Sequence, residues 1–236
     1  MSTTLGASAK AIDVLMDKAC KALEAAEYFK AEELCERAFA ESRERHDFER
    51  CARICLPLQE ARRQRRQAAI DTNRIRTISQ LPSPRADIAE GMYLLTPPLV
   101  GIAARDFRAR ANKQEVPTMI LVREPTTRSG KWPIVGVGTG PREPVVVRVQ
   151  LEPPAAEPTV PWFLSAQEAL GDAAIRGAPQ DVPADHHVDD LADLLEAVPD
   201  HEKLIQELAA ACRAAIGSTP STLPRRRPLD SSPFSF

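Results

Sequence analysis

The spacing of apolar residues changes twice along this 236-residue chain, and this change limits the fold more than any other feature. Up to about residue 56, apolar residues recur every three to four positions, which is the spacing of one face of an α-helix. Between residues 92 and 151 they form short runs bounded by proline and glycine, which is typical of strands. Helical spacing returns from residue 165 to residue 216. Helices on both sides of a strand-rich segment predict an α+β fold.

Three helices are predicted in the first 72 residues. Their apolar stripes are Ile12, Leu15, Met16, Ala19, Leu23 and Ala26 in the first, Ala31, Leu34, Cys35, Ala38 and Phe39 in the second, and Cys51, Ala52, Cys55 and Leu56 in the third. Pro57 is expected to kink or restart the third helix, because proline removes a backbone donor. Beyond it, Arg62, Arg63, Arg65 and Arg66 cover most of the helix circumference. A core does not absorb that many charges, so we expect this segment to face solvent or a partner.

Residues 23–39 (LEAAEYFKAEELCERAF) resemble the middle of a tetratricopeptide repeat. In that family an aromatic residue near the turn between two helices precedes small residues on the second helix, and Tyr28, Ala31 and Ala38 match those positions. The resemblance covers about residues 12–45 and implies a helical hairpin that binds other proteins. No second complete copy follows, and a single repeat cannot bury its apolar face alone. The third helix, the rest of the chain or a partner must therefore cover that face.

A linker is predicted at residues 73–91, where the helical periodicity ends. It separates a helical region, residues 1–72, from an α+β domain, residues 92–216. In that domain the sequence predicts strands at 92–95, 118–123, 132–137 and 144–151 and a basic helix at 102–113. The β-α-β-β-β order implies one parallel crossover followed by hairpins, which gives a small mixed sheet. The apolar run at 118–123 is typical of a central strand that is buried on both faces.

Three C-terminal helices are predicted to cover the sheet. The first starts at Ser165, which forms a capping box with Glu168, and ends at Gly177 before a proline. Two more helices follow, the last of them capped by Asp200. Residues 217–236 lack the apolar content that would offset the entropy of ordering, so we predict a disordered tail.

The composition excludes several classes of protein. A net charge of −2 gives no general attraction to nucleic acid or acidic lipid. No apolar run approaches the roughly 20 residues needed to span a bilayer, and the first ten residues lack the basic and apolar regions of a signal peptide. The five cysteines lie at apolar positions of predicted helices and are expected to be reduced core thiols. We therefore expect a cytoplasmic protein that does not contact a membrane.

A glycine motif, Gly136-x-Gly138-x-Gly140, follows a predicted strand and has two interpretations. A phosphate-binding loop would need a helix directly after it, so that backbone amides face the phosphate. Here Pro141 and Pro144 precede another strand instead. The pattern therefore favours a hairpin turn, and no cofactor is predicted.

Two groups of side chains have the composition of a metal site. Cys51 and Cys55 lie one helical turn apart and could bind zinc together with His46. The second group, near the start of a predicted helix, consists of His186, His187, Asp189, Asp190 and Asp193. Core packing explains the cysteines, and the helix dipole favours acidic side chains at a helix N-terminus. These explanations are preferred, so no metal is predicted.

The leading interpretation is a non-catalytic cytoplasmic adaptor that binds a protein partner. No serine or cysteine nucleophile occurs in a recognised motif with histidine and carboxylate, so no catalytic residue is predicted. The helical hairpin would supply the docking surface, with Tyr28, Arg62, Arg63, Arg65 and Arg66 as exposed contact residues. Homo-oligomerisation is left open.

Two alternative functions are also left open. A small-molecule-binding or enzymatic domain would place its pocket at the loop 123–131, lined by Arg123, Glu124, Arg128 and Lys131. Nucleic-acid contact would use the arginine-rich helix, Arg62–Arg66. No aromatic residues interleave with these arginines for base stacking, and the acidic stretch 181–207 could pair with them instead.

Overall fold

The computed structural model describes residues 2–139 and 144–225, with side chains from residue 10 onward. This part of the chain contains seven helices and five strands, which confirms the α+β class. The helices are α1 (Ser2–Glu24), α2 (Tyr28–Glu44), α3 (Phe48–Asp71), α4 (Gly101–Lys113), α5 (Val160–Gly177), α6 (Ala184–Ala197) and α7 (Glu202–Ala215). The strands are β1 (Ile75–Ile78), β2 (Gly91–Leu95), β3 (Thr118–Arg123), β4 (Trp132–Gly138) and β5 (Val145–Leu151). Among the helices so described, none is long and apolar enough to cross a bilayer.

The five strands form one mixed sheet in the order β1-β2-β3-β4-β5. Strands β1, β2 and β3 are parallel, whereas β3, β4 and β5 pair antiparallel. Helix α4 connects β2 to β3, so the predicted β-α-β-β-β order is confirmed from β2 to β5. Strand β1 lies inside the stretch predicted as a linker. It is four residues long and carries Arg76 and Thr77, so it lacks the apolar run that marks the other strands.

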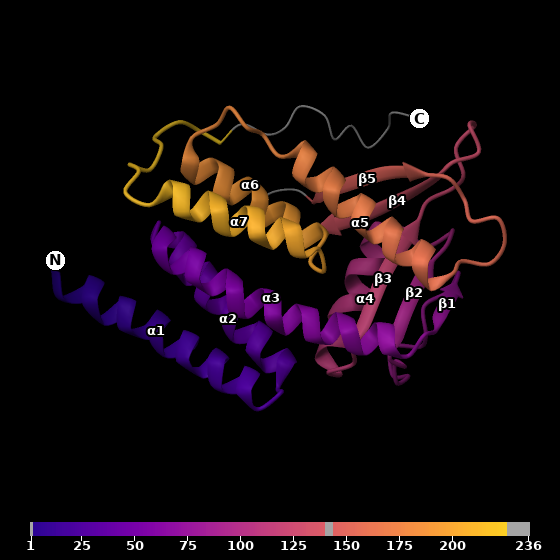
Figure 1. Cartoon of the computed structure of the whole chain (residues 1–236), viewed down its shortest axis with the longest axis horizontal. Coiled ribbons are helices and arrows are strands. Elements are labelled where there is room, and N and C mark those ends of the chain that lie inside the picture. The colour runs from indigo at the N-terminus through magenta and orange to yellow at the C-terminus, as the bar shows by residue number, and fades with distance from the viewer. Residues whose placement is uncertain (1, 140–143, 226–236) are drawn as a thin grey trace.

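Both faces of the central strands are buried, because successive side chains of a strand point to opposite faces. The larger core contains Met92, Leu94, Met119 and Leu121 together with residues of α1–α3 and α5–α7. The smaller core contains Tyr93, Leu95, Ile120 and Val122 together with Phe107 and Ala111 of α4. Helix α4 therefore covers one face of the sheet, and the other helices share the core on the opposite face (Figure 1).

The N-terminal helices belong to the larger core. Helix α2 packs against both α1 and α3, and α3 runs alongside α7 and reaches β2 and β3 (Figure 1). Buried residues of this core extend from Ile12 in α1 to Ala215 in α7. The apolar face that was expected to need a cover is therefore covered by other elements of the same chain.

Three details of the N-terminal helices differ from the sequence prediction. Helix α3 does not restart at Pro57, which lies inside it. Leu56, predicted to be buried, is 73% exposed, whereas Ile54 and Leu58 are buried. Cys20 is exposed, and the other four cysteines are buried thiols. The buried stripe of α3 thus follows regular helical spacing through Cys51, Ile54, Cys55 and Leu58.

Two helix caps lie at residues other than those predicted. Helix α5 begins after Thr159, whose hydroxyl accepts a hydrogen bond from the amide three residues later at 3.4 Å, so Ser165 is inside the helix. Helix α7 begins after His201, whose Nδ1 accepts from the amide three residues later at 3.3 Å, one residue after the predicted cap Asp200. Gly177 was predicted to follow the C-cap of α5, but it is the last helical residue and Ala178 is the C-cap, so the predicted end is right to within two residues.

The glycines of β4 are explained by packing. A Cβ atom at Gly136 would lie 2.5 Å from the Ala197 carbonyl oxygen, and one at Gly138 would lie 2.9 Å from the Ala197 nitrogen. These glycines therefore let the end of α6 approach the strand closely. Strand β4 pairs antiparallel with β5, with Gly138 opposite Val145, which confirms the hairpin. The predicted turn residue Gly140 lies outside the described residues.

The first part of the predicted disordered tail is held against α6. The amide of Ser221 donates to Asp185 Oδ2 at 2.7 Å, and the Arg225 guanidinium pairs with Asp190 and, at 2.8 Å, with Asp193. Ion pairs thus order a segment that has little apolar content. Residues 226–236 lie outside the described part of the chain, so the prediction of disorder stands for them as a prediction.

Candidate functional site

The arginine-rich half of α3 faces other helices. Arg62 is 9% exposed, and its guanidinium donates to the carboxylates of Glu32 and Glu36 on α2, both at 2.8 Å. It also donates to the Pro199 carbonyl oxygen at 3.1 Å. The expectation that Arg62 is exposed is wrong, because acidic residues of α2 and the loop between α6 and α7 cover it.

Arg65 extends this network from α3 to α4. Its guanidinium carbon lies 3.8 Å from the centroid of the Phe29 ring, and its Nη2 donates to Asn112 Oδ1 at 2.5 Å. Arg65 also pairs with Glu32, which it shares with Arg62. Glu32 is therefore shared by two guanidiniums, and Glu36 is a second partner of Arg62.

The other predicted contact residues are divided between the interior and the surface. Arg66 pairs with Glu168 of α5 at 3.3 Å and with Glu202 of α7 at 3.4 Å. The pairing with Glu202 confirms that the acidic stretch 181–207 contacts these arginines. Tyr28 is half-buried, and Arg63 alone of the four arginines is exposed. Three of the four arginines therefore stabilise contacts within the chain.

A cleft of about 390 Å³, which we call the arginine cleft, lies between α2, α3, α4 and α6. Its charged lining consists of Arg43, Arg62, Arg65, Arg105, Arg108, Glu32, Glu36, Glu196 and Asp200, and its apolar lining includes Phe39, Leu58, Leu195 and Leu208. The volume lies within the range of roughly 300–1,000 Å³ that is typical of small-molecule sites.

Two arginines of the arginine cleft are balanced by carboxylates that do not line it. Arg43 pairs with Asp189 at 2.5 Å and with Asp193 at 3.0 Å on α6. Arg105 pairs with its neighbour Asp106 at 3.0 Å. These two arginines thus have partners of their own.

The remaining charges are distributed unevenly with depth. Glu36, with a side chain 54% exposed, and Glu196, which is exposed, lie at the rim. The deep part holds Arg62, Arg65 and Arg108 with side chains 9, 11 and 21% exposed, and Glu32 and Asp200 with side chains 9 and 17% exposed. Arg62 also reaches Glu36 at the rim at 2.8 Å, so Arg65, which shares Glu32, and Arg108 are the deep guanidiniums with the least compensation.

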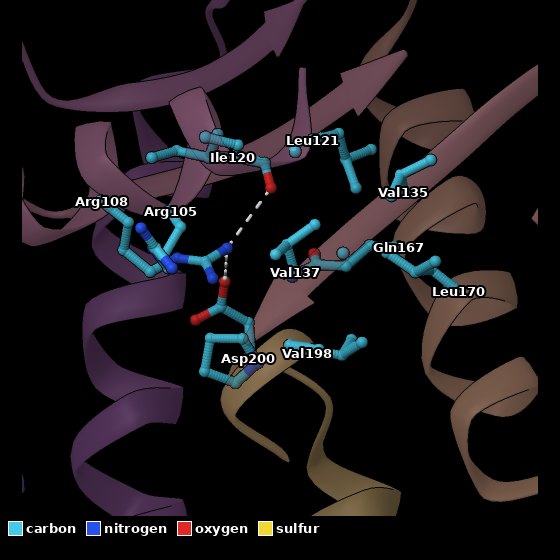
Figure 2. Close-up of a pocket in the computed structure, with 15 residues that line it drawn as sticks. Arg105, Arg108, Ile120, Leu121, Val135, Val137, Gln167, Leu170, Val198 and Asp200 are labelled. Atoms are coloured by element: carbon cyan, nitrogen blue, oxygen red, sulfur yellow. Dashed lines mark hydrogen bonds and ion pairs between the residues drawn. The ribbon is translucent and has the colours of Figure 1, made fainter. Parts of the chain in front are cut away.

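Arg108 has the weakest partners of the three deep arginines. Its Nη2 donates to the Ile120 carbonyl oxygen at 3.4 Å and lies 3.6 Å from Asp200 Oδ2 (Figure 2). Burial lowers the pKa of Arg108, Asp200 opposes that change, and Arg62 lowers the pKa further. Burial likewise lowers the pKa of Arg65 to about 10, with Asp200 again opposing. Both guanidiniums would gain from a further negative charge.

A smaller cavity, which we call the inner pocket, adjoins the arginine cleft. It has a volume of about 20 Å³, enough for one water-sized group, and shares Arg105, Arg108, Pro199 and Asp200 with the cleft. Gln167, only 4% exposed, also lines it (Figure 2). Within the described part of the chain, Gln167 Oε1 and Asp200 Oδ2 have no hydrogen-bond donor. The inner pocket therefore presents acceptors that lack a described hydrogen bond, although Asp200 Oδ2 also forms the 3.6 Å ion pair with Arg108.

A cluster of Glu168, Asp172 and His201 has ligand atoms close enough to hold a metal ion. However, His201 Nδ1 accepts a hydrogen bond from the Leu204 amide, so the proton of the neutral ring lies on Nε2. That proton occupies the lone pair a metal would need. The Nε2 atom instead faces Glu168 and Asp172 at 3.4 and 3.5 Å, and Lys203 pairs with the same carboxylates. The cluster is an ion-pair network.

The two thiols considered for zinc pack in the core, which is the explanation that the sequence favoured. Cys51 and Cys55 are at most 1% exposed, and the Cys55 thiol donates to the Cys51 carbonyl oxygen at 3.2 Å. His46 is exposed and contacts the Phe48 ring edge-on at 5.7 Å. The cysteines and the histidine therefore have different partners and do not form one group.

The second group considered for a metal also has partners. Asp189, Asp190 and Asp193 pair with Arg43 and Arg225. His187 Nδ1 lies 2.8 Å from the Pro179 carbonyl oxygen, and His186 is buried. Arginines, rather than the helix dipole alone, therefore balance the acidic residues of α6.

The residues of the loop 123–131 lie away from both cavities. Arg123 lies over the Trp132 ring at 4.5 Å, Glu124 pairs with Arg148 at 2.9 Å, Lys131 pairs with Glu152 at 3.5 Å, and Arg128 is exposed. Neither the arginine cleft nor the inner pocket includes any of them.

Sequence reasoning missed Arg43, Arg105 and Arg108 as site residues. They come from two helices that are more than 50 residues apart in the sequence, and only the fold brings them together. One signal was present: Arg105 and Arg108 are three residues apart, so they lie on the same side of a helix that was predicted to be basic.

Comparisons of the chain with protein-family profiles, with curated proteins and with solved structures found no match.

Proposed function

We propose that the protein binds a small organic anion, a carboxylate or a phosphate ester, in the arginine cleft. The observation that supports this most strongly is Arg108. It lies in a cleft of about 390 Å³, and its one described carboxylate partner, Asp200, is 3.6 Å away. A guanidinium binds carboxylate or phosphate through two parallel hydrogen bonds, so an anion seated on Arg108 would supply the missing partner.

The neighbouring groups support the same chemistry. Burying a guanidinium is costly unless an anion and hydrogen bonds compensate it. In the deep part of the arginine cleft, Arg65 shares Glu32 with Arg62, and Arg108 lies 3.6 Å from Asp200. Thr118, 7% exposed, lines the same cleft, and its hydroxyl has no partner in the described chain. This hydroxyl is available to hydrogen-bond a ligand.

This proposal differs from the leading interpretation of the sequence. The adaptor function relied on the apolar face of the hairpin, and other elements of the chain cover that face. The adaptor function therefore gains no support from the fold and stays a prediction. The small-molecule alternative is kept, but its site moves from the loop 123–131 to the arginine cleft.

Thermal unfolding with succinate, glutarate, glycerol 3-phosphate and inorganic phosphate tests the proposal. At a concentration 100-fold above Kd, a ligand stabilises the native state by about 2.7 kcal/mol. For a chain of this size, this raises Tm by roughly 5–10 °C. We expect at least one of the four to raise Tm in the wild type and in Arg63→Gln, whose arginine lies outside the cleft. The double variant Arg105→Gln, Arg108→Gln should lose the shift.

Two results would contradict the proposal. One is the absence of any shift with all four anions in the wild type. The other is a shift of equal size in the double variant, which would place the anion elsewhere on the protein.

A further inference from the structure

We propose that the ligand of the arginine cleft also carries an amino group, which the inner pocket binds, so that the ligand is an acidic amino acid. This inference rests on the proposed function, because it assigns a second group of the same ligand. It starts from the inner pocket, which shares Arg108 and Asp200 with the cleft. A ligand in the cleft can therefore reach the pocket with one small group.

The inner pocket is suited to a hydrogen-bond donor with a positive charge. Three acceptors line it: Gln167 Oε1 and Asp200 Oδ2, which lack a described hydrogen-bond donor, and the Ile120 carbonyl oxygen, to which Arg108 donates at 3.4 Å. An ammonium group has three N–H donors. Its size is close to that of water, which matches a volume of about 20 Å³.

Asp200 and Gln167 differ in what they contribute. Asp200 supplies the negative charge that an ammonium group needs in a buried place. Gln167 is 4% exposed, so a buried amide oxygen without a donor is itself costly. A bound amino group would satisfy both residues. Figure 2 shows Gln167 and Asp200 coming from different elements to line this one pocket.

The arrangement of charges selects an amino acid over a simple amine. In an α-amino acid the carboxylate carbon and the nitrogen are bonded to the same carbon, two bonds apart. The two charges are therefore close enough to face Arg108 and Asp200, which lie 3.6 Å apart. The carboxylate would bind Arg108 and Arg105, and the ammonium group would enter the inner pocket.

The partners of the deep arginines favour an acidic side chain. Arg62 pairs with two carboxylates, Glu32 and Glu36, each at 2.8 Å. Arg65 shares Glu32 with Arg62, and among the described residues Arg108 has Asp200 at 3.6 Å as its carboxylate partner. A neutral amino acid brings one carboxylate, which Arg108 would bind. An acidic amino acid brings a second, which would lie toward Arg65.

Calorimetric titration of the full chain with two matched pairs of probes tests this inference. The pairs are L-glutamate with glutarate and L-aspartate with succinate, which differ only by the amino group. In the wild type we expect the better-binding amino acid to bind at least about 10-fold more tightly than the dicarboxylate of its pair. A hydrogen bond to a charged group contributes enough free energy for that difference. This comparison needs no variant.

Two variants locate the effect. Gln167→Leu should weaken binding of the amino acid about 10-fold, and Gln64→Leu should leave it unchanged, because Gln64 bonds to Glu60 on α3 away from the cleft. Circular dichroism and Tm without ligand check that both variants fold.

The outcomes separate the two proposals. Equal affinity within both pairs would overturn the amino-group inference and leave anion binding in place. An amino-acid preference that persists in Gln167→Leu would also overturn it, because the amino group would then bind elsewhere. If none of the four probes binds, the failure lies with the proposed function and the inference falls with it.

Discussion

Gly171 sets how closely α5 and α7 approach each other. The His201 ring lies against its backbone, and a Cβ atom at this position would be 2.0 Å from His201 Cγ. Alanine normally stabilises a helix interior relative to glycine by about 1 kcal/mol. Here we expect Gly171→Ala to destabilise the protein by about 1–3 kcal/mol, because a fully buried ring would have to move.

Urea unfolding measures this effect, with Gly177→Ala as the matched control. Gly177 ends the same helix, and a Cβ atom there would meet nothing within 4 Å. A Gly171→Ala variant as stable as the control would show that the ring does not pack on this glycine.

His201 predicts how stability depends on pH. Burial lowers the pKa of His201, with Glu168 and Asp172 opposing. The unfolded chain, with a His pKa of about 6.5, therefore binds more protons than the native state once pH falls below that value. Stability present above about pH 6.5 should thus decrease as pH falls toward the lower pKa of the folded protein. Protonation of Nδ1 would also remove the cap of α7.

The variant His201→Asn isolates this contribution, because asparagine can still cap a helix but does not titrate. We expect the free energy of unfolding to fall less steeply between roughly pH 7 and pH 5 in His201→Asn than in the wild type. His46→Asn is the control, since His46 is exposed and has a positive φ that asparagine tolerates. Parallel pH profiles for wild type and His201→Asn would contradict this assignment.

At the scale of elements, α6 depends on arginines from two distant segments. Asp190 and Asp193, with side chains 4 and 5% exposed, pair with Arg225 of the C-terminal segment, and Asp193 also pairs with Arg43 of α2. Burial raises the pKa of Asp190, and Arg225 opposes that change. A segment predicted to be disordered thus neutralises buried carboxylates.

Removing this partner should be costly. We expect Arg225→Gln to lower the free energy of unfolding by about 1–3 kcal/mol at pH 7, because it leaves a buried carboxylate without its cation. The loss should shrink as pH falls and Asp190 takes up a proton. Arg213→Gln, which changes an exposed arginine on α7, is the control in the same urea titration. Equal stability of the two variants would mean that the C-terminal segment does not hold α6.

Most of the helices and strands could be predicted from the sequence, and the exceptions have physical reasons. Periodicity predicted the helices and four of the five strands, because each has a clear apolar pattern. Strand β1 was missed because it is only four residues long and partly polar. It is a strand because it pairs with β2, which its own sequence does not reveal. The caps at Thr159 and His201 were missed because tertiary packing decides at which residue a helix begins, and the cap is the residue before that point.

At the scale of the whole molecule, the arginine cleft exists only because four helices meet beside the start of β3 and the end of β4. A helical wheel of α3 alone indicates an exposed charged face, since it carries no information about Glu32 and Glu36 on α2. Likewise, Arg43 and Arg108 belong to one site only after α2 and α4 are placed in space. Sequence patterns follow single elements, and this site is a property of their assembly.

The measurement that tests the central claim most directly is a titration of L-glutamate followed by NMR of the arginine Nε–H groups. The Nε atoms of Arg65 and Arg108 are buried and lack a described hydrogen-bond partner, so their signals should respond to a nearby anion. We expect the signals of Arg65, Arg105 and Arg108 to move and saturate together, while that of the exposed Arg63 stays fixed. Movement of Arg63 alone, or of none of these signals at any concentration, would contradict ligand binding in the arginine cleft.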